Sequence, residues 1–426
     1  MTAFSIQSIH GRRVWDSRGR PTVEAEVTLK DGAKGRAIAP AGASKGTREA
    51  LELRDGGEPF GGLDVLQAVG HINGEIAKAL IGTDAENQFA LDQTLIALDG
   101  TENKTRLGAN ATLAVSMAAA HAMAKASGLA LYRYLGQGKV GRLPMPQIQI
   151  FGGGAHAGRR VDVQDFMVVC PGASSFAQAL EWTAEVYRHA GLLMAQRGSL
   201  FGVADEGGWW PDFSSNEQAL ELLVLSIERA GFVPGEQVAI ALDIAASEFG
   251  KRGQYRLGLE SRALDSDGLI EMLLGWIAKY PIVSIEDPLA EDDPEGFARF
   301  TQAIGDRLQI VGDDFLVSSS KLIREAANIG AANTVLLKPN QRGTLSETLE
   351  AWKVAQELGY AAIVSARSGE TEDTTIVDLA IGWNVGQLKV GSFARSERMA
   401  KWNHALRIEE ELAGNAHFAG ASVFRK

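Results

Sequence analysis

The sequence predicts an α/β protein in which a smaller N-terminal α+β domain precedes a closed β/α barrel. Residues 22–39 have the pattern of a β-hairpin, and residues from about 62 to 137 have a helical pattern. Beyond residue 146, short runs of β-branched residues recur, each followed by a helical stretch. A chain of 426 residues is long enough for two such domains, and we place them at 1–137 and 138–426.

The hairpin is indicated by alternating side chains and by a turn. From Val23 to Leu29, apolar and polar residues alternate, which is typical of a strand with one buried face. Asp31-Gly32 then supplies a turn signal. A glycine-rich loop follows at residues 40–46, but it lacks the Gly-Lys-Ser/Thr ending of a phosphate-binding P-loop. We therefore reject a P-loop at this position.

The helical part of the N-terminal domain contains an alanine-rich stretch from Ala111 to Ala126. Alanine has the highest helix propensity, so this stretch predicts a helix. Pro144 and Pro146 then interrupt the pattern. Because proline ends regular helices, we expect the domain boundary close to these residues.

The second half of the chain repeats a strand-then-helix unit about every 25 to 45 residues, a spacing that suits β/α units with insertions. At least five units in about 280 residues favour a closed barrel over an open sheet. The predicted strands are Val238–Leu242, Ile282–Ile285, Leu308–Val311, Thr334–Leu337 and Ala361–Val364.

Charge and composition exclude several classes of partner. The formal net charge of −11 argues against nucleic acid and against an anionic membrane surface, both of which need a basic footprint. The single cysteine, Cys170, cannot form an intramolecular disulfide and is expected to be a small buried side chain. Residues 1–13 do not resemble a signal peptide, and no run of 18 apolar residues occurs. We expect a cytoplasmic protein.

Charged residues follow each predicted strand. In a β/α barrel the carboxyl ends of the strands meet on one face, which holds the active site. Six successive strands would therefore bring carboxylates, two lysines and an arginine into one small volume. The residues at these ends are Asp243, Glu286-Asp287, Asp313-Asp314, Lys338, Arg367-Ser368 and Lys389, the last ending the run Gln387-Leu388.

Three of these carboxylates predict a metal site. Asp243, Glu286 and Asp313 come from three different strands, and oxygen ligands without histidine or cysteine suit Mg²⁺. Asp287 and Asp314 are adjacent to predicted ligands. We expect them to point elsewhere and to support the ligands through hydrogen bonds.

Lys338 is the predicted general base. A neighbouring divalent cation and Lys389 would both favour its neutral form and lower its pKa. A proton next to a carboxylate is very weakly acidic, and its removal puts a second charge on that carboxylate. One or two Mg²⁺ ions can hold such a dianion, so the constellation suits proton abstraction followed by β-elimination.

At these residues the sequence closely resembles the enolase family, and the resemblance extends from Asp16–Gly19 to Arg407–Glu410. It implies a barrel of enolase type, Mg²⁺ as cofactor, and dehydration of 2-phosphoglycerate, a small phosphorylated carboxylate, to phosphoenolpyruvate in glycolysis. It also implies a homo-oligomer, either a dimer or an octamer. A lysine base beside Mg²⁺ is the known arrangement of enolase-superfamily sites. The specific motifs are Arg48–Gly56, Asp99–Lys104, Asp205–Gly208, Ser284–Asp287, Val311–Asp314, Ser368–Asp373 and Ala394–Arg398.

The resemblance also implies a role for each matching residue. Glu206 matches the general acid that helps the β-hydroxyl leave, and Asp165 stands where the family has a carboxylate partner of that acid. His156 matches a histidine on a mobile loop that closes over the substrate. The remaining matches are Lys338 for the base, Asp243, Glu286 and Asp313 for the Mg²⁺ ligands, Lys389 for the substrate carboxylate, and Arg367 and Ser368 for the phosphate.

Three positions depart from the family pattern. Ala41 replaces a serine that helps to bind a second Mg²⁺, and Ala366 replaces a histidine of the Ser-His-Arg-Ser-Gly-Glu motif. Asp165 replaces a glutamate and shortens that carboxylate. All three lie around the phosphate, the second metal and the leaving hydroxyl, and Lys45 adds a cation that we expect to contact the substrate.

These departures leave the substrate open. An enolase with a rearranged phosphate end would still dehydrate 2-phosphoglycerate. The same proton abstraction could instead serve another 2-substituted carboxylate, such as a phosphonate analogue. A non-catalytic binding or structural protein is a further alternative, against which the retained base, acid and metal ligands argue.

Overall fold

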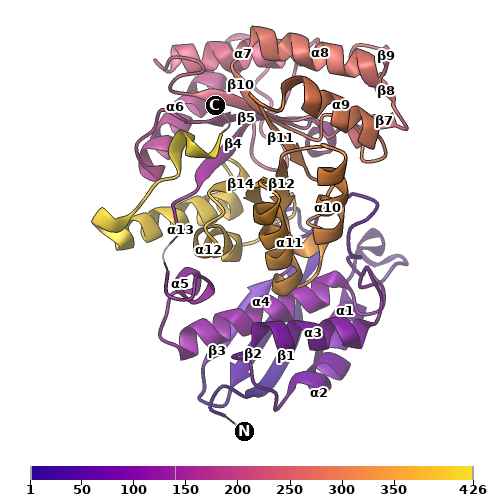
Figure 1. Cartoon of the computed structure of the whole chain (residues 1–426), viewed down its shortest axis with the longest axis vertical. Coiled ribbons are helices and arrows are strands. Elements are labelled where there is room, and N and C mark those ends of the chain that lie inside the picture. The colour runs from indigo at the N-terminus through magenta and orange to yellow at the C-terminus, as the bar shows by residue number, and fades with distance from the viewer. Residues whose placement is uncertain (1, 140, 425–426) are drawn as a thin grey trace.

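The computed structural model describes residues 2–139 and 141–424, and its N-terminal part begins with a three-stranded antiparallel sheet in the order β1-β2-β3 (Figure 1). The predicted hairpin is confirmed, since β2 and β3 pair across the turn at Asp31-Gly32. The strands are β1 (Ile6–Trp15), β2 (Pro21–Leu29) and β3 (Lys34–Ile38). The helices are α1 (Leu66–His71), a π-helical turn (Ile72–Ile76), α2 (Ala77–Leu80), α3 (Gln88–Asp99), α4 (Ala109–Ala126) and α5 (Leu131–Leu135).

Helix α4 packs against β2 and β3 along almost its whole length, and most of its residues are buried. Its many alanines allow the helix backbone to approach the sheet closely. Gly35 of β3 marks the closest approach, because a Cβ built there would lie 2.1 Å from the Ala118 carbonyl oxygen. The alanine-rich pattern thus encodes a helix and also the surface that meets the sheet.

The C-terminal part forms a closed barrel in the order β10-β11-β12-β13-β14-β4-β5-β6. The predicted β/α barrel is therefore confirmed, and each of the five predicted strands is present within a residue at either end. The barrel strands are β4 (Met145–Gly152), β5 (Asp165–Val169), β6 (Ala239–Asp243), β10 (Ile282–Glu286), β11 (Gln309–Gly312), β12 (Thr334–Leu337), β13 (Ala361–Ser365) and β14 (Gln387–Ser392).

Strands β4 and β5 were not among the predicted strands. Pro146, read from the sequence as a break, lies inside β4 and pairs in register with Leu388. Strand β5 runs antiparallel to both β4 and β6. Its first residue, Asp165, therefore pairs with Asp243, the last residue of β6. The reversed strand brings its amino end to the face where the parallel strands place their carboxyl ends.

Helices surround the barrel, and a small sheet lies beside it (Figure 1). The helices are α6 (Phe176–Gln196), α7 (Asn216–Arg229), α8 (Ser266–Lys279), α9 (Pro294–Ile304), α10 (Ser320–Asn328), α11 (Leu345–Glu357), α12 (Thr375–Gly382) and α13 (Ser396–Leu412). The small sheet consists of β7 (Gly250–Lys251), β8 (Gln254–Leu257) and β9 (Arg262–Asp265). The division at residues 137/138 falls between α5 and β4 and stays a prediction.

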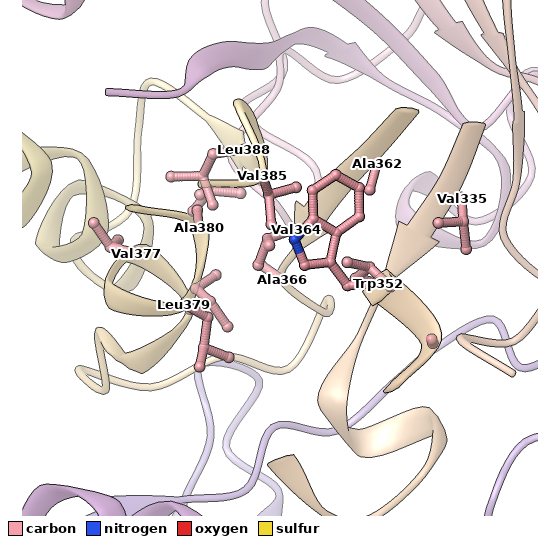
Figure 2. Packing of buried hydrophobic residues seen from close by; sticks show 14 of the residues in the cluster. Val335, Trp352, Ala362, Val364, Ala366, Val377, Leu379, Ala380, Val385 and Leu388 are labelled. Carbon is pink, nitrogen blue, oxygen red and sulfur yellow. The ribbon is translucent and has the colours of Figure 1, made fainter. Parts of the chain in front are cut away.

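The core between barrel and helices is closed by large side chains such as Trp352 of α11. Its ring lies among side chains of the barrel wall, including Val364 and Ala362 (Figure 2). The indole Nε1 donates a hydrogen bond to the Trp383 carbonyl oxygen at 3.0 Å, so its polar atom is satisfied. The helix α11 is thereby fixed against β12 and β13, the strands that precede Lys338 and Arg367.

The loop after β3 crosses from the N-terminal part onto the barrel. Ala41 forms a two-way backbone bridge with Gly369, with N···O distances of 2.9 and 2.8 Å. Arg48 donates a hydrogen bond to the Phe315 carbonyl oxygen at 2.8 Å. The N-terminal domain therefore contributes directly to the face of the barrel where the strands end.

Two further expectations concern single features. Cys170 is buried as predicted, and burial raises the pKa of its thiol to about 12. Among the described helices, none is long and apolar enough to cross a membrane.

Candidate active site

A small cleft lies at the strand ends, and Ala43 and Ser44 of the loop after β3 form part of its lining. Eight of the predicted site residues line it. Glu286 and Asp313 do not line it themselves, but each is bonded to a lysine that does. The lining residues are Ala43, Ser44, His156, Gln164, Asp165, Glu206, Asp243, Lys338, Ser365, Ala366, Arg367, Ser368, Lys389 and Val390.

Lys389 is the electrostatic centre of one side of the cleft. Its buried Nζ lies 2.9 Å from Asp243, 2.9 Å from Glu286 and 3.1 Å from Asp165. Burial disfavours the ammonium, but Asp243 and Glu286 outweigh it and hold the pKa of Lys389 well above its usual value. Burial and Asp243 also raise the pKa of Glu286 well above its ordinary range. Three carboxylates thus share one ammonium.

Lys389 does not end its strand, as the sequence pattern suggested, but lies in the middle of β14. Side chains alternate along a strand, so Gln387 and Lys389 share a face. Gln387 accepts a buried hydrogen bond from Gln147 at 3.0 Å. The long lysine side chain starts one layer below the rim, and its ammonium extends to the carboxylates at the ends of the neighbouring strands.

Lys338 follows β12 and forms a buried ion pair with Asp313. Burial would lower the pKa of Lys338, but the Asp313 carboxylate outweighs it and raises that pKa above its usual value. The direction of the Lys338 pKa shift is therefore opposite to the predicted lowering, because the ion pair with Asp313 stabilises the ammonium form. Gln341 donates a hydrogen bond to the other oxygen of Asp313 at 2.8 Å.

Asp287 supports the backbone around Asp313 through hydrogen bonds, as expected. Its carboxylate accepts hydrogen bonds from the backbone N–H groups of Asp313 at 2.9 Å and of Asp314 at 2.8 Å. Burial and the charge of Asp313 raise the pKa values of both Asp287 and Asp314 well above their ordinary range. These two residues help to set the backbone that presents Asp313.

Glu206 and His156 face each other across the cleft, with 3.7 Å between His156 Nε2 and Glu206 Oε1. His156 is buried, and its Nδ1 has no hydrogen-bond partner among the described residues. Burial would raise the pKa of Glu206, but His156, Arg398 and Lys389 outweigh it and lower that pKa. The surrounding cations therefore favour the carboxylate form of Glu206.

Arg367 links the barrel to the N-terminal domain. Its guanidinium pairs with Glu49 at 2.9 Å and donates to the Ser44 carbonyl oxygen at 2.7 Å. Glu49 and the other partners hold the pKa of Arg367 above its usual value despite burial. Ser368 accepts a hydrogen bond from Arg18 at 3.2 Å. Both predicted phosphate-binding residues are therefore held in place by the N-terminal domain.

The positions that depart from the family pattern lie in different surroundings. Ala366 lines the cleft, and Ala41 is buried in its bridge to Gly369. Lys45 is outside the cleft, because its half-exposed ammonium pairs with Glu52 at 2.6 Å. Substrate contact by Lys45 would require this ion pair to break.

The structure brings most of the predicted residues together but divides the predicted metal ligands. Asp243 and Glu286 surround Lys389, whereas Asp313 faces Lys338. Within the described chain, the groups of three metal-type donors within 4.8 Å are His156, Asp165 and Glu206, and Asp287, Asp313 and Asp314. The oxygen donors still fit a hard cation, because Asp243, Glu286 and Asp313 offer buried carboxylate oxygens, the ligand type that such cations prefer.

Sequence reasoning missed the amides and the carboxylate that support these charges. Gln164 donates to Asp243 at 3.0 Å, and Gln341 contacts Asp313. Glu49 lies inside a quoted motif, yet its pairing with Arg367 joins residues 318 positions apart. A buried glutamine has no distinctive spacing, so no sequence signal identifies such residues.

The fold and the cleft together define a β/α-barrel enzyme that can carry out acid–base chemistry on an anionic substrate. Residues 6–135 match the family model described as the enolase N-terminal domain, and residues 141–426 match the enolase C-terminal TIM barrel domain. The chain is 50% identical over 427 aligned residues to Enolase 1 of Desulfitobacterium hafniense (strain Y51), covering 100% of this chain and 98% of that protein. The chain belongs to the enolase family, and its class is that of an enolase-type hydro-lyase.

Proposed function

We propose that this protein is a Mg²⁺-dependent enolase that dehydrates 2-phosphoglycerate to phosphoenolpyruvate in glycolysis. The observation that carries the proposal is the sharing of one ammonium by Asp243, Glu286 and Asp165, with Lys338 lining the same cleft. The family resemblance adds a cytoplasmic homo-oligomer, either a dimer or an octamer.

Asp243, Glu286 and Asp313 would hold the Mg²⁺ ion. All three are buried carboxylates at or next to strand ends, which is the donor set that Mg²⁺ prefers. Bound there, the ion supplies positive charge that stabilises a doubly charged substrate carboxylate. The lysine contacts of these carboxylates would have to loosen in the loaded site.

Lys338 acts as the base that removes the proton next to the substrate carboxylate. Only the neutral amine can accept a proton, and the ion pair with Asp313 now favours the charged form. A cation held by Asp313 would compete with Lys338 for that carboxylate and would so remove this raising effect on the Lys338 pKa. Lys389 then faces the substrate carboxylate on the opposite side.

Glu206, assisted by Asp165, acts as the acid that protonates the departing hydroxyl group. An acid must hold a proton, whereas the cations around Glu206 lower its pKa. A phosphorylated carboxylate brings negative charge next to Glu206 and so raises that pKa. Substrate binding itself would therefore prepare the acid, with His156 closing over the substrate.

Arg367 and Ser368 bind the phosphate group. Arg367 lies in the cleft with its charge fixed, and Arg18 holds the Ser368 hydroxyl. A guanidinium gives strong charge-assisted hydrogen bonds to phosphate oxygens. Because Arg367 is also tied to Glu49, phosphate binding depends on the N-terminal domain.

The cleft also supports a second candidate, the same reaction on another 2-substituted carboxylate such as a phosphonate analogue. The specific observation is that Ala366 lines the cleft at a position where the family pattern has a histidine. Each lost charge-assisted hydrogen bond costs about 1.5 to 3 kcal/mol. At 1.36 kcal/mol per decade, that cost lowers the rate about 10- to 200-fold.

Steady-state assays on 2-phosphoglycerate and on its phosphonate analogue decide between the candidates. We expect the higher kcat/KM on 2-phosphoglycerate. A preference for the phosphonate, together with loss of that activity when Ala41→Ser and Ala366→His are introduced, would support the second candidate. No turnover of either compound with Mg²⁺ would contradict both.

A further inference from the structure

Gln149 of β4 joins the two acidic residues to which we assign the departure of the hydroxyl group. Its buried side-chain N–H donates a hydrogen bond to the Asp165 carboxylate. The oxygen of the same side-chain amide, Oε1, accepts a hydrogen bond from the Gly208 backbone N–H at 2.9 Å. Gly208 lies two residues after Glu206, so one amide connects the start of β5 to the turn that carries Glu206.

The surroundings leave space for this amide and for little else. A Cβ built at Gly208 would lie 2.4 Å from Gln149 Oε1, and one at Gly152 would lie 2.6 Å from the Ala204 Cβ. Side chains at these two positions would push the amide or the turn aside. The backbone of Gln149 is fixed as well, since its carbonyl oxygen accepts a hydrogen bond from Ser392 at 2.5 Å.

The Asp165 carboxylate is consequently held from two sides. Gln149 contacts one oxygen, and Lys389 lies 3.1 Å from the other. An aspartate is one methylene shorter than the glutamate of the family pattern, so a long partner is needed to reach it. Glutamine is one methylene longer than asparagine and spans the distance.

We propose that Gln149 is a positioning residue that sets Asp165 and Glu206 relative to each other for elimination of the hydroxyl group. The inference rests on the proposed function, because it assigns Gln149 to that step. It also implies that Asp165 and Gln149 work as a matched pair of side-chain lengths. Lengthening Asp165 alone would push its carboxylate into the amide, and shortening Gln149 alone would break the contact.

The test shortens one side chain in Gln149→Asn, lengthens the other in Asp165→Glu, and combines both changes in a double variant. All are assayed with Mg²⁺ and 2-phosphoglycerate. Small misplacements of catalytic groups cost up to about a hundredfold in rate, so each single change should lower kcat about 10- to 100-fold with little change in KM. Gln149→Asn should retain exchange of the substrate α-proton with solvent. The double variant keeps the total side-chain volume and should recover to within about threefold of wild type.

Gln147 supplies the matched control. It is buried in the same strand and on the same face, but its amide contacts Gln387. Gln147→Asn should not rescue Asp165→Glu. Rescue by Gln147→Asn, or a double variant as slow as the product of the two single losses, would overturn the role of Gln149.

Unfolding free energies of the same four proteins keep this inference separate from the proposed function. A wild type without turnover of 2-phosphoglycerate would refute the function. In that case the unfolding free energies alone would show whether Gln149 and Asp165 interact. Non-additive losses of stability in the single and double variants would support the interaction, and additive losses would overturn it.

Discussion

Lys389 is a single cation that contacts several acidic residues of the cleft at once. Its ammonium contacts three buried carboxyl groups, those of Asp165, Asp243 and Glu286, which lie close together around it. Buried charges without partners are costly. A divalent cation bound to these carboxyl groups would relieve that cost, and this predicts that metal binding depends on them.

Replacement of Asp243 by asparagine removes one proposed ligand charge while keeping the side-chain shape. We expect the Mg²⁺ affinity measured by calorimetry to fall by about tenfold or more, because outer and inner ligand contacts each contribute at this level. Asp306→Asn, at an exposed position, is the control and should bind as wild type does. Equal Mg²⁺ affinity in both variants would refute the ligand assignment.

The sequence predicts which charged residues gather at the cleft where these residues lie at strand ends, and it does not predict the others. Asp243, Glu286 and Lys338 follow parallel strands, so the pattern alone places them on one face. Asp165 reaches the same face because β5 is reversed, which no hydrophobic pattern reports. Gln149 and Gln341 are connected through contacts distant in sequence, and only the three-dimensional structure reveals them.

At the scale of the element, α4 depends on small residues where it meets β3. Gly35 has an ordinary backbone conformation, but a Cβ there would lie 2.1 Å from both the Ala118 oxygen and the Ala122 nitrogen. Both contacts are backbone atoms, so a rotamer change cannot relieve the overlap.

Gly35→Ala should therefore destabilise the protein by about 1 to 3 kcal/mol, the usual cost of overpacking. Gly74→Ala is the control, because this exposed helical position has no neighbour within 4 Å. An alanine there should be neutral or stabilising by up to about 1 kcal/mol. Urea unfolding measures both changes, and equal stability of the two variants would contradict the close approach of α4 and β3.

Element prediction succeeded where local pattern and tertiary environment agree. The hairpin and the strands before the charged residues have clear alternation or β-branched runs. Strand β4 contains Pro146, a residue type that usually interrupts a strand, yet the barrel accommodates it. The reason is tertiary, since the strand is held by both its neighbours in a closed barrel.

At the scale of the whole molecule, the two parts of the chain are joined by buried polar contacts. Asp92 of α3 accepts hydrogen bonds from the Ser346 N–H at 2.9 Å and from its hydroxyl at 2.6 Å, at the start of α11. Burial raises the pKa of Asp92 from 3.8 to about 6. The junction between the N-terminal helices and the barrel therefore contains a titrating group.

Asp92 makes the free energy of unfolding depend on pH, because the folded and unfolded chains bind its proton with different affinity. Between about pH 4 and pH 6 the folded protein binds more protons at Asp92 than the unfolded chain, so its contribution to stability falls as the pH rises. Asp92→Asn cannot ionise. Its stability relative to wild type should improve by up to about 3 kcal/mol from pH 4 to pH 7.5. Urea unfolding at both pH values checks this, and a constant difference would contradict it.

We propose that Lys338 removes the substrate α-proton in a site that needs a divalent cation. The most direct measurement is the exchange of that proton with deuterated solvent, followed by magnetic resonance on 2-phosphoglycerate. We predict exchange by wild type with Mg²⁺, none after chelation, none by Lys338→Ala, and continued exchange but slow elimination by Glu206→Gln. Exchange by Lys338→Ala at the wild-type rate would show that Lys338 is not the base.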